Sequence, residues 1–364
     1  MYEKTAVIFR VPAHNDIAGQ KRELMRGDME KMGIIKTMAR AVPALAAAAA
    51  LTLGASAAEL VPVGEAVGIE VQTEGMLVAG LTAVETAGGE ELCPAADCGV
   101  EPGDIITRLG SREVLTAEDF AAAAAELDGG EVTLTLQRGG KTIQYSIAPV
   151  RAASGEWRLG LLLRDGMSGI GTVTYYDPAT GSYGALGHSI NDPASGSELP
   201  LGGGVITEAQ VAGVLPGRAG QAGELHGVFD VEAQLGSVLL NTQQGIFGRT
   251  SAWAGRQAVP AAEPGQIADG PAKILANVSG DEVREFAVNV EKSGSKLLVT
   301  VTDPELLSIT GGIVQGMSGC PILQEGRLIG AVTHVLVNDP ARGYGIPIYS
   351  MLAAAESIEQ RDAA

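Results

Sequence analysis

Apolar residues in this chain gather in short runs, and glycine, proline or polar residues interrupt each run after a few positions. Runs of this length between turn residues are typical of β-strands. The first group of runs is Met76–Leu81, Ile105–Leu109, Val132–Gln137 and Thr142–Ile147. The second group is Leu159–Leu163, Thr172–Tyr176, Gly202–Ile206, Val211–Val214, Gly236–Leu240, Gly245–Gly248, Ala272–Val278, Glu285–Val290 and Leu297–Val301. The pattern predicts a mainly β chain: a small β domain, then a barrel or sandwich.

Helix signals are confined to two segments of these domains. Thr116-Ala117-Glu118-Asp119 is a capping box that opens an alanine-rich helix, and Gly129-Gly130 ends it. Ile348–Glu359 is amphipathic, and we expect it to pack as a helix on the second barrel. We expect a linker around Arg151–Arg158. The predicted domains are therefore residues 59–150 and residues 151–364.

A longer apolar segment precedes both domains. Ala41–Ala58 is uncharged, rich in alanine and leucine, follows a basic flank and contains Ala55-Ser56-Ala57 near its end. These features are typical of a secretory signal peptide, while the length approaches the roughly 18 residues of a membrane-spanning helix. We therefore interpret residues 1–58 as a tail followed by a signal peptide or membrane anchor, with a buried helix as the alternative. In either of the first two cases, the residues after Glu59 are exported.

Composition and charge narrow the classes of function. The 364 residues include 50 glycines and 17 prolines, and 43 acidic residues outweigh 25 Lys and Arg to give a formal charge of −18. An acidic chain without a basic cluster is a poor nucleic-acid binder, because phosphate contacts need Lys and Arg. The sequence has no glycine-rich phosphate loop and no cluster of metal ligands. We therefore expect no nucleic-acid partner, no metal and no cofactor.

The cysteines carry little information. Cys93 and Cys98 either close a small disulfide loop or stay as free buried thiols. No histidine lies near them, which argues against a zinc site. Cys320 has no evident partner.

The candidate chemistry centres on Gly316-Met317-Ser318-Gly319-Cys320-Pro321. A serine hydroxyl is a weak nucleophile that needs an adjacent base and backbone N–H groups aimed at the developing oxyanion. Glycines on both sides of Ser318 permit the tight turn that presents such groups, and Pro321 stiffens the exit. Ser168 stands in a second Gly-Met-Ser-Gly sequence that lacks the following proline, so Ser318 is the preferred nucleophile.

Of the four histidines, His188 is best placed for a general base, because it ends a Gly-Ala-Leu-Gly run where a strand would stop. His14 lies in the N-terminal tail, and His226 lies in a polar, glycine-rich loop. His334 lies in an apolar run that a strand would bury, so we expect its replacement by alanine to leave rate and pH dependence unchanged. A lone histidine is more often structural than catalytic, and the residues alone do not decide between the two roles.

The segment from Gly311 to Pro347 resembles the stage IV sporulation protein B family, PDZ-containing serine peptidases of spore-forming bacteria. The hexapeptide at Ser318 is similar to the nucleophile turn of chymotrypsin-like enzymes. The resemblance implies a double β-barrel in which His188 is the general base and Asp303 the carboxylate that orients it. It also implies an oxyanion hole formed by the N–H groups of Gly316 and Ser318. Cys320 stands where the family has serine, and the resemblance places Ser168 in a structural turn upstream of His188.

Asp303 lies fifteen positions before Ser318, a spacing that is not typical of chymotrypsin. An Asp-Pro pair also suits a turn or a helix cap, and the rival carboxylates are Asp177, Asp192 and Asp339. We expect activity to rise with pH through ionisation of His188 near the usual pKa of about 6.5. Asp303, as the partner, would move that pKa upward.

A second resemblance concerns the first domain. Gly99-Val100-Glu101-Pro102-Gly103-Asp104-Ile105-Ile106 resembles the signature of bacterial PDZ domains. Such domains bind an extended peptide as an added strand and hold its carboxylate in a backbone loop. The resemblance implies that Val67, Gly68 and Ile69 form that loop and that the helix after Thr116 lines the groove. A small β domain that serves only as a spacer is the alternative.

Together the resemblances imply an exported serine endopeptidase of sporulation, located between the forespore and mother-cell membranes. Its expected activities are self-cleavage near the N-terminus and cleavage of a membrane-bound regulatory protein, which triggers activation of a late sigma factor. The groove of the PDZ domain is expected to bind a peptide C-terminus or the protein's own chain. The alternative is an inactive peptidase-like scaffold that signals through peptide binding alone.

Overall fold

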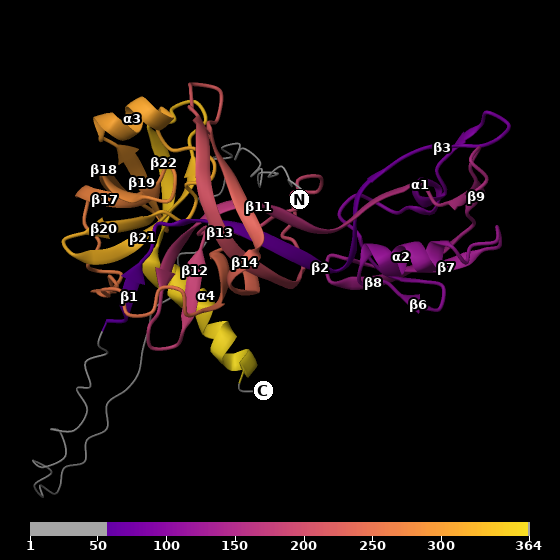
Figure 1. The fold of residues 1–364 in the computed structure, drawn as a ribbon, viewed down its shortest axis with the longest axis horizontal. Coiled ribbons are helices and arrows are strands. Elements are labelled where there is room, and N and C mark those ends of the chain that lie inside the picture. The colour runs from indigo at the N-terminus through magenta and orange to yellow at the C-terminus, as the bar shows by residue number, and fades with distance from the viewer. Residues whose placement is uncertain (1–56, 363–364) are drawn as a thin grey trace, which may run out of the picture. The chain divides into compact units, whose positions relative to one another are not determined.

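The computed structural model describes residues 57–362, which are mainly β (Figure 1). The mainly β prediction is therefore confirmed. Nearly all of the predicted tail and signal or anchor segment, with His14, lies outside the described residues. Within residues 57–362, no helix is both long and apolar enough to cross a membrane.

The first barrel is a ring of antiparallel strands around buried side chains that include Ile69, Val173, Tyr183 and Trp253. In pairing order the strands are β2 (Ala66–Leu81), β11 (Leu161–Tyr176), β12 (Ser182–Ala185), β15 (Gly245–Thr250), β14 (Glu224–Thr242) and β13 (Leu201–Leu215). The ring closes because β13 pairs with β2. The short strands β1 (Glu59–Pro62) and β16 (Val259–Pro260) pair with each other, and β1 also pairs with β11.

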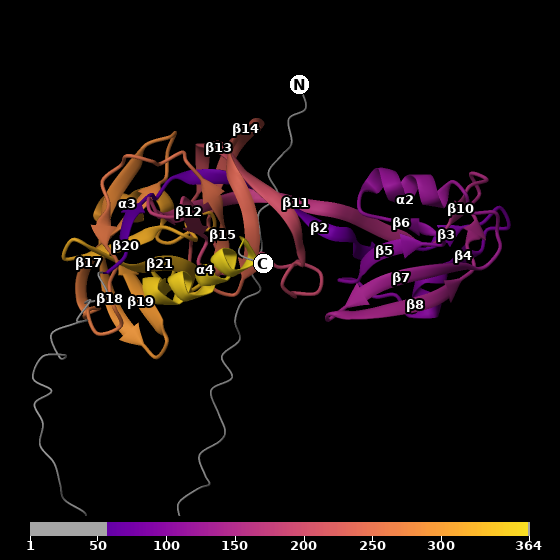
Figure 2. The same cartoon turned by 90° about the horizontal axis from the view of Figure 1, so that it is seen from below.

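The second barrel is closed and follows the first in the chain. Its strands in pairing order are β17 (Gly270–Asn277), β18 (Val283–Ser293), β19 (Lys296–Val301), β22 (Arg342–Pro347), β21 (Arg327–Val335) and β20 (Pro321–Gln324). Helix α3 (Pro304–Thr310) connects β19 to the loop before β20. Helix α4 (Ile348–Asp362) contacts β21 and β22 as expected, and it also contacts β14 and β15 of the first barrel (Figure 2).

The predicted PDZ domain is built on the second half of β2. The sheet continues from β2 through β5 (Ile105–Leu109), β7 (Val132–Arg138) and β8 (Lys141–Ile147), with β6 (Arg112–Glu113) beside β5. Figure 2 shows α2 (Ala117–Ala124) lying over this sheet, and the predicted capping box at its start is present. The remaining elements are α1 (Pro94–Cys98) and the strand pairs β3 (Val84–Glu85) with β4 (Glu91–Leu92) and β9 (Val150–Arg151) with β10 (Trp157–Arg158).

Strands β2 and β11 belong to both domains. Ile69 of β2 pairs with Gly169 and Ile206 in the first barrel, whereas Met76 and Leu81 of the same strand pair with residues of the PDZ region. Sheet pairing joins strands that are distant in the chain. A cut between residues 150 and 151 therefore does not separate the two domains.

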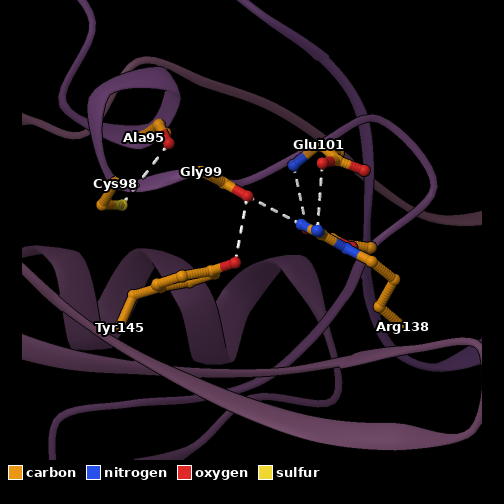
Figure 3. Close-up of polar contacts among 7 residues, drawn as sticks. Ala95, Cys98, Gly99, Glu101, Arg138 and Tyr145 are labelled. Atoms are coloured by element: carbon orange, nitrogen blue, oxygen red, sulfur yellow. Dashed lines mark hydrogen bonds and ion pairs between the residues drawn. The ribbon is translucent and has the colours of Figure 1, made fainter.

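The acidic residue of the PDZ-like signature stabilises its own loop. Asp104 is buried and accepts hydrogen bonds from the Glu101 N–H at 2.9 Å and from Arg138 Nε and Nη2 at 2.6 and 2.7 Å. The Gly99 carbonyl accepts hydrogen bonds from Arg138 at 2.8 Å and from the Tyr145 hydroxyl at 3.1 Å (Figure 3). The hydrogen bond to Asp104 raises the pKa of Arg138 above its usual value. A buried carboxylate needs such partners, which explains the Gly-Asp pair of the signature.

Candidate active site

Ser318 lies in the loop between α3 and β20. The carbonyl groups of this loop accept hydrogen bonds from residues of β11. The carbonyls of Gly316 and Gly319 accept hydrogen bonds from the hydroxyls of Thr172 and Thr174, each at 2.8 Å. The Ser318 carbonyl accepts from the Thr172 N–H at 3.0 Å. Both threonines are buried, so these bonds form where water does not compete. The sequence reasoning did not identify Thr172 or Thr174, although their alternation in the strand is visible.

The N–H groups of residues 316–320 fall into two classes. Three donate to protein carbonyls, namely those of Met317, Gly319 and Cys320. Among residues 57–362, the N–H groups of Gly316 and Ser318 have no hydrogen-bond acceptor. Donors held by a rigid loop and left without an acceptor are what an oxyanion requires. The predicted oxyanion-hole role of Gly316 and Ser318 stays a prediction, and this geometry is compatible with it.

Gly319 is the residue that allows the loop to lie against β11. Its φ is +100°, and a Cβ added there would lie 1.9 Å from the Thr172 carbonyl oxygen. Any other residue would meet both an unfavourable backbone conformation and a backbone atom that cannot move aside. The glycine after Ser318 is therefore required by packing as well as by the turn.

The Ser318 hydroxyl donates to the Thr333 carbonyl of β21 at 2.7 Å. Among the described residues, no hydrogen bond joins Ser318 to His188. The proton of the candidate nucleophile is thus held by a carbonyl, which cannot act as its base. Attack on a substrate requires the side chain to rotate away from Thr333 toward an imidazole.

His188 follows β12, after two residues in the left-handed region, Leu186 at φ +67° and Gly187 at φ +70°. The histidine is 7% exposed, and its Nδ1 lies 2.8 Å from the Ser189 carbonyl. If Nδ1 carries the proton and donates there, Nε2 is the nitrogen that accepts a proton. Burial lowers the pKa of His188 below its usual value, and the hydrogen bond to Ser189 only partly offsets this.

The Thr172 backbone connects the segments that carry His188 and Ser318, and the Asn241 side chain binds the residues after His188. The Thr172 carbonyl accepts from the Leu186 N–H at 3.2 Å, while the Thr172 N–H donates to the Ser318 carbonyl. Asn241 of β14 fixes the other side of His188 by exchanging two hydrogen bonds with the Ile190 backbone, each at 2.8 Å. Strand pairing between distant segments places Thr172 and Asn241 beside His188. The sequence around either residue therefore does not indicate this role.

Asp303 is the N-cap of α3. Its Oδ1 accepts from the N–H groups of Glu305 and Leu306 at 2.9 and 3.1 Å, and its Oδ2 accepts from the Ala287 N–H at 3.2 Å. Burial raises the pKa of Asp303, but these three hydrogen bonds outweigh it and bring the pKa below its usual value. No hydrogen bond joins Asp303 to His188 among the described residues, so the role of Asp303 as the partner of His188 stays a prediction.

The rival Asp192 lies in the segment that follows His188. It is 2% exposed, its Oδ2 accepts from the Ser195 N–H at 2.8 Å, and its Oδ1 has no partner among the described residues. An unpaired buried carboxylate oxygen is costly. Asp192 therefore stays the next candidate after Asp303.

Ser168 is not in a turn, contrary to the expectation from the resemblance. It lies within β11 and pairs with Glu70 of β2. A serine in a paired strand has no loop of free N–H groups around it. The thiols of Cys93, Cys98 and Cys320 are free, so the alternative of a Cys93–Cys98 disulfide is not realised in this structure. Burial raises the pKa of Cys320 to about 12, which makes this thiol a poor nucleophile.

The structure also corrects the predicted peptide-binding loop. Val67, Gly68 and Ile69 lie in β2 and pair with β11 on one side and β13 on the other. Backbone groups that are paired on both edges cannot bind a carboxylate. A Cβ on Gly68 would lie 2.5 Å from both Phe229 and Thr207, so a bulky residue there would disrupt the first barrel instead.

The groove in the PDZ region lies elsewhere. A cavity of about 950 Å³ separates α2, with Phe120, Ala121 and Ala124, from the start of β11 at Leu161 and Leu162. This part of β11 pairs with β2 on one edge, and no described strand pairs with its other edge. Leu162 is 51% exposed. A free strand edge beside a helix is the arrangement that accepts a peptide as an added strand.

Residues 57–362 contain no group of three or more His, Cys, Asp or Glu side chains that could hold a metal ion.

Comparison with protein families gives two matches. The model described as SpoIVB peptidase S55 matches residues 155–352, more than half of the chain, and a PDZ domain model matches residues 87–138. A search of curated proteins gives no match.

Two similar solved structures are an inactive serine-to-alanine mutant of Rv3671c from M. tuberculosis H37Rv and a mutant of human heparin binding protein (CAP37). The first is 13% identical over 52% of this chain and 82% of that chain, with a TM-score of 0.29. The second is 11% identical over 49% of this chain and 74% of that chain, with a TM-score of 0.25. Likeness at this level carries no argument about activity.

Proposed function

Because the chain belongs to the SpoIVB peptidase S55 family, we propose that it is a serine endopeptidase with Ser318 as nucleophile and His188 as general base. The observation that carries this proposal is the loop at Ser318. Its carbonyls are hydrogen-bonded to β11, and within residues 316–320 the N–H groups of Gly316 and Ser318 have no acceptor among the described residues. The two N–H groups would stabilise the oxyanion of the tetrahedral intermediate, an effect worth about 10²–10³ in rate per donor.

The proposed reaction begins with rotation of the Ser318 side chain from the Thr333 carbonyl toward His188. His188 Nε2 takes the hydroxyl proton as the oxygen attacks the peptide carbonyl, and the imidazolium then protonates the leaving amine. Asp303, as the proposed third member, would stabilise that imidazolium. In this structure Asp303 accepts three backbone hydrogen bonds at the N-terminus of α3.

The proposed biological role is that of an exported peptidase of sporulation. The protein would be membrane-anchored or released between the forespore and mother-cell membranes, would cleave itself and a membrane-bound regulator, and would thereby trigger activation of a late sigma factor. Family membership and the apolar segment Ala41–Ala58 support this role. The groove between α2 and Leu161 is the proposed site for a peptide C-terminus or a segment of the chain itself.

One observation favours a second candidate function, an inactive scaffold that acts through peptide binding alone. The Ser318 hydroxyl is bonded to Thr333, and Asp303 is bonded to backbone N–H groups. A protein in which the base and the nucleophile cannot react would act through the groove of the PDZ domain alone.

Incubation of residues 59–364 with a fluorophosphonate, followed by mass spectrometry, distinguishes the two functions. An active enzyme reacts at Ser318, and Ser318→Ala abolishes both labelling and self-cleavage. Ser168→Ala is the matched control and should react normally, because Ser168 lies in a paired strand. No labelling of the unmodified chain would favour the scaffold, and loss of labelling in Ser168→Ala would contradict the assignment of Ser318.

A further inference from the structure

We infer that His334 is a positioning residue for His188, whose ring supports the imidazolium that forms when Ser318 loses its proton. The centroids of the two imidazole rings are 5.0 Å apart, and the rings are tilted by 45°. This separation lies within the range of aromatic pairs in contact. The inference deepens the proposed function and rests on it.

Rigid elements determine the approach of the two rings. His334 is half-buried on β21, directly after Thr333, whose carbonyl accepts the Ser318 hydroxyl. The Thr333 side chain donates to the Tyr344 carbonyl of β22 at 3.1 Å. On the other side, a Cβ on Gly187 would lie only 2.8 Å from Thr333, so the residue before His188 packs directly on β21. The strand that binds the nucleophile thus also carries the ring beside the base.

The chemistry follows from the charge that develops on His188. When His188 accepts the proton of Ser318 it becomes a cation inside a buried site, which is costly without a partner. An aromatic ring within about 6 Å of a cation stabilises that cation through its π-electrons. Among the described residues, the hydrogen-bond and ion-pair geometry gives His188 no carboxylate. The His334 ring is therefore a source of stabilisation for the imidazolium.

This geometry revises the expectation that His334 serves only as a buried strand residue. The expectation came from the apolar run around it, and β21 is indeed a paired strand. Strand pairing does not decide which side chains meet across the barrels, and here the second barrel places His334 beside a residue that is 146 positions earlier in the chain.

The test compares four chains: the unmodified protein, His334→Ala, His334→Leu and His334→Phe. Phenylalanine keeps an aromatic ring, leucine keeps only apolar volume, and alanine keeps neither. We expect the rate of fluorophosphonate labelling at Ser318 to fall about three- to tenfold in the alanine and leucine variants. The phenylalanine variant should restore most of it. His226→Ala is the control, since His226 is exposed and lies near Glu224.

A second readout does not need activity. NMR titration of the histidine signals, in a Ser318→Ala background, gives the pKa of His188 in each chain. Loss of the ring at position 334 removes a group that favours the imidazolium, so that pKa should fall by about half a unit or more in the alanine and leucine variants. The pKa of His188 in the phenylalanine variant should match its pKa in the unmodified protein.

Other titratable groups on these elements include Arg327 on β21, Arg342 on β22 and Tyr344, opposite His334 on β22. Lys296 on β19 places its ammonium 5.3 Å from the Tyr344 ring centroid. Asp192 lies in the segment after His188. These groups are identical in all four chains, so differences report the ring at position 334. Thermal unfolding of each chain separates loss of folding from loss of positioning.

Equal pKa values of His188 in all four chains would overturn the inference, and so would a leucine variant that behaves like the phenylalanine variant. Absence of labelling in every chain, together with a pKa that depends on the ring, would contradict the proposed peptidase instead. The two failures are therefore distinguishable.

Discussion

Asp303 shows at the residue scale how one carboxylate can satisfy a structural and a catalytic hypothesis at once. It caps α3, and it is also the proposed partner of His188. Asparagine caps a helix about as well as aspartate, whereas replacement by alanine typically costs about 1 kcal/mol. The pair of substitutions therefore separates the two roles.

We expect Asp303→Asn to fold with nearly unchanged stability but to lose activity by several orders of magnitude, about 10⁴ in the serine-protease example. Asp303→Ala should lose activity and also unfold at lower denaturant concentration. Denaturant unfolding and fluorophosphonate labelling measure the two effects. A near-normal rate for Asp303→Asn would leave the cap as the only role of Asp303, and Asp192→Asn would be tested next.

The pH dependence of labelling reports the burial of His188. The sequence expectation placed its pKa near 6.5 or above, but burial lowers it. Since only the neutral imidazole accepts the Ser318 proton, the acid limb of the labelling rate should lie below pH 6.5. A limb at or above that value would show that a carboxylate reaches His188 in the active state.

Stability should change over the same range of pH. Between the folded and unfolded pKa values of His188, the unfolded chain binds more protons than the folded one. Its contribution to stability is therefore complete above about pH 6.5 and is lost as the pH falls toward the lower, folded pKa. Denaturant unfolding at several pH values, compared between the unmodified chain and His188→Gln, measures this contribution.

At the scale of elements, the loop before β20 depends on its close contact with β11. We expect Gly319→Ala to destabilise the protein by at least about 2 kcal/mol, since the residue has positive φ and its Cβ would meet the Thr172 carbonyl. Labelling of Ser318 should be lost as well. Gly265→Ala is the matched control, because a Cβ there meets nothing within 4 Å. Equal unfolding midpoints for the two variants would contradict the described packing of the loop.

At the scale of the whole molecule, β11 carries both the groove edge at Leu161 and the threonines that hold the Ser318 loop. We expect Ala124→Arg to block peptide binding in the groove, because Ala124 lines the cavity. Labelling of Ser318 by the small fluorophosphonate should continue. Fluorescence anisotropy with a labelled peptide and mass spectrometry measure the two effects.

Ala122→Arg is the control for that experiment, since Ala122 lies on the exposed side of the same helix and does not line the cavity. If Ala124→Arg also prevents labelling, occupancy of the groove is coupled to the active site, and β11 is the connecting element. If both variants bind peptide normally, the groove is not the binding site.

The local features of this protein follow from its amino-acid sequence. Short apolar runs between glycines specify strands, Thr116 and Asp119 specify the start of α2, and the glycines around Ser318 specify a tight loop. These features depend on neighbouring residues, whose backbone preferences and hydrogen bonds are legible along the chain. The PDZ signature is legible for the same reason, because Asp104 bonds to the Glu101 N–H three residues away.

Contacts between residues that are distant in the chain depend on the tertiary structure. Val67, Gly68 and Ile69 were predicted to form a binding loop from local resemblance, but pairing on both edges places them inside the first barrel. Thr172 and His334 carry no local signal, and they lie at the site because the closure of two barrels joins strands that are far apart in the chain. Such contacts depend on register and packing between distant strands, so they cannot be derived from local sequence alone.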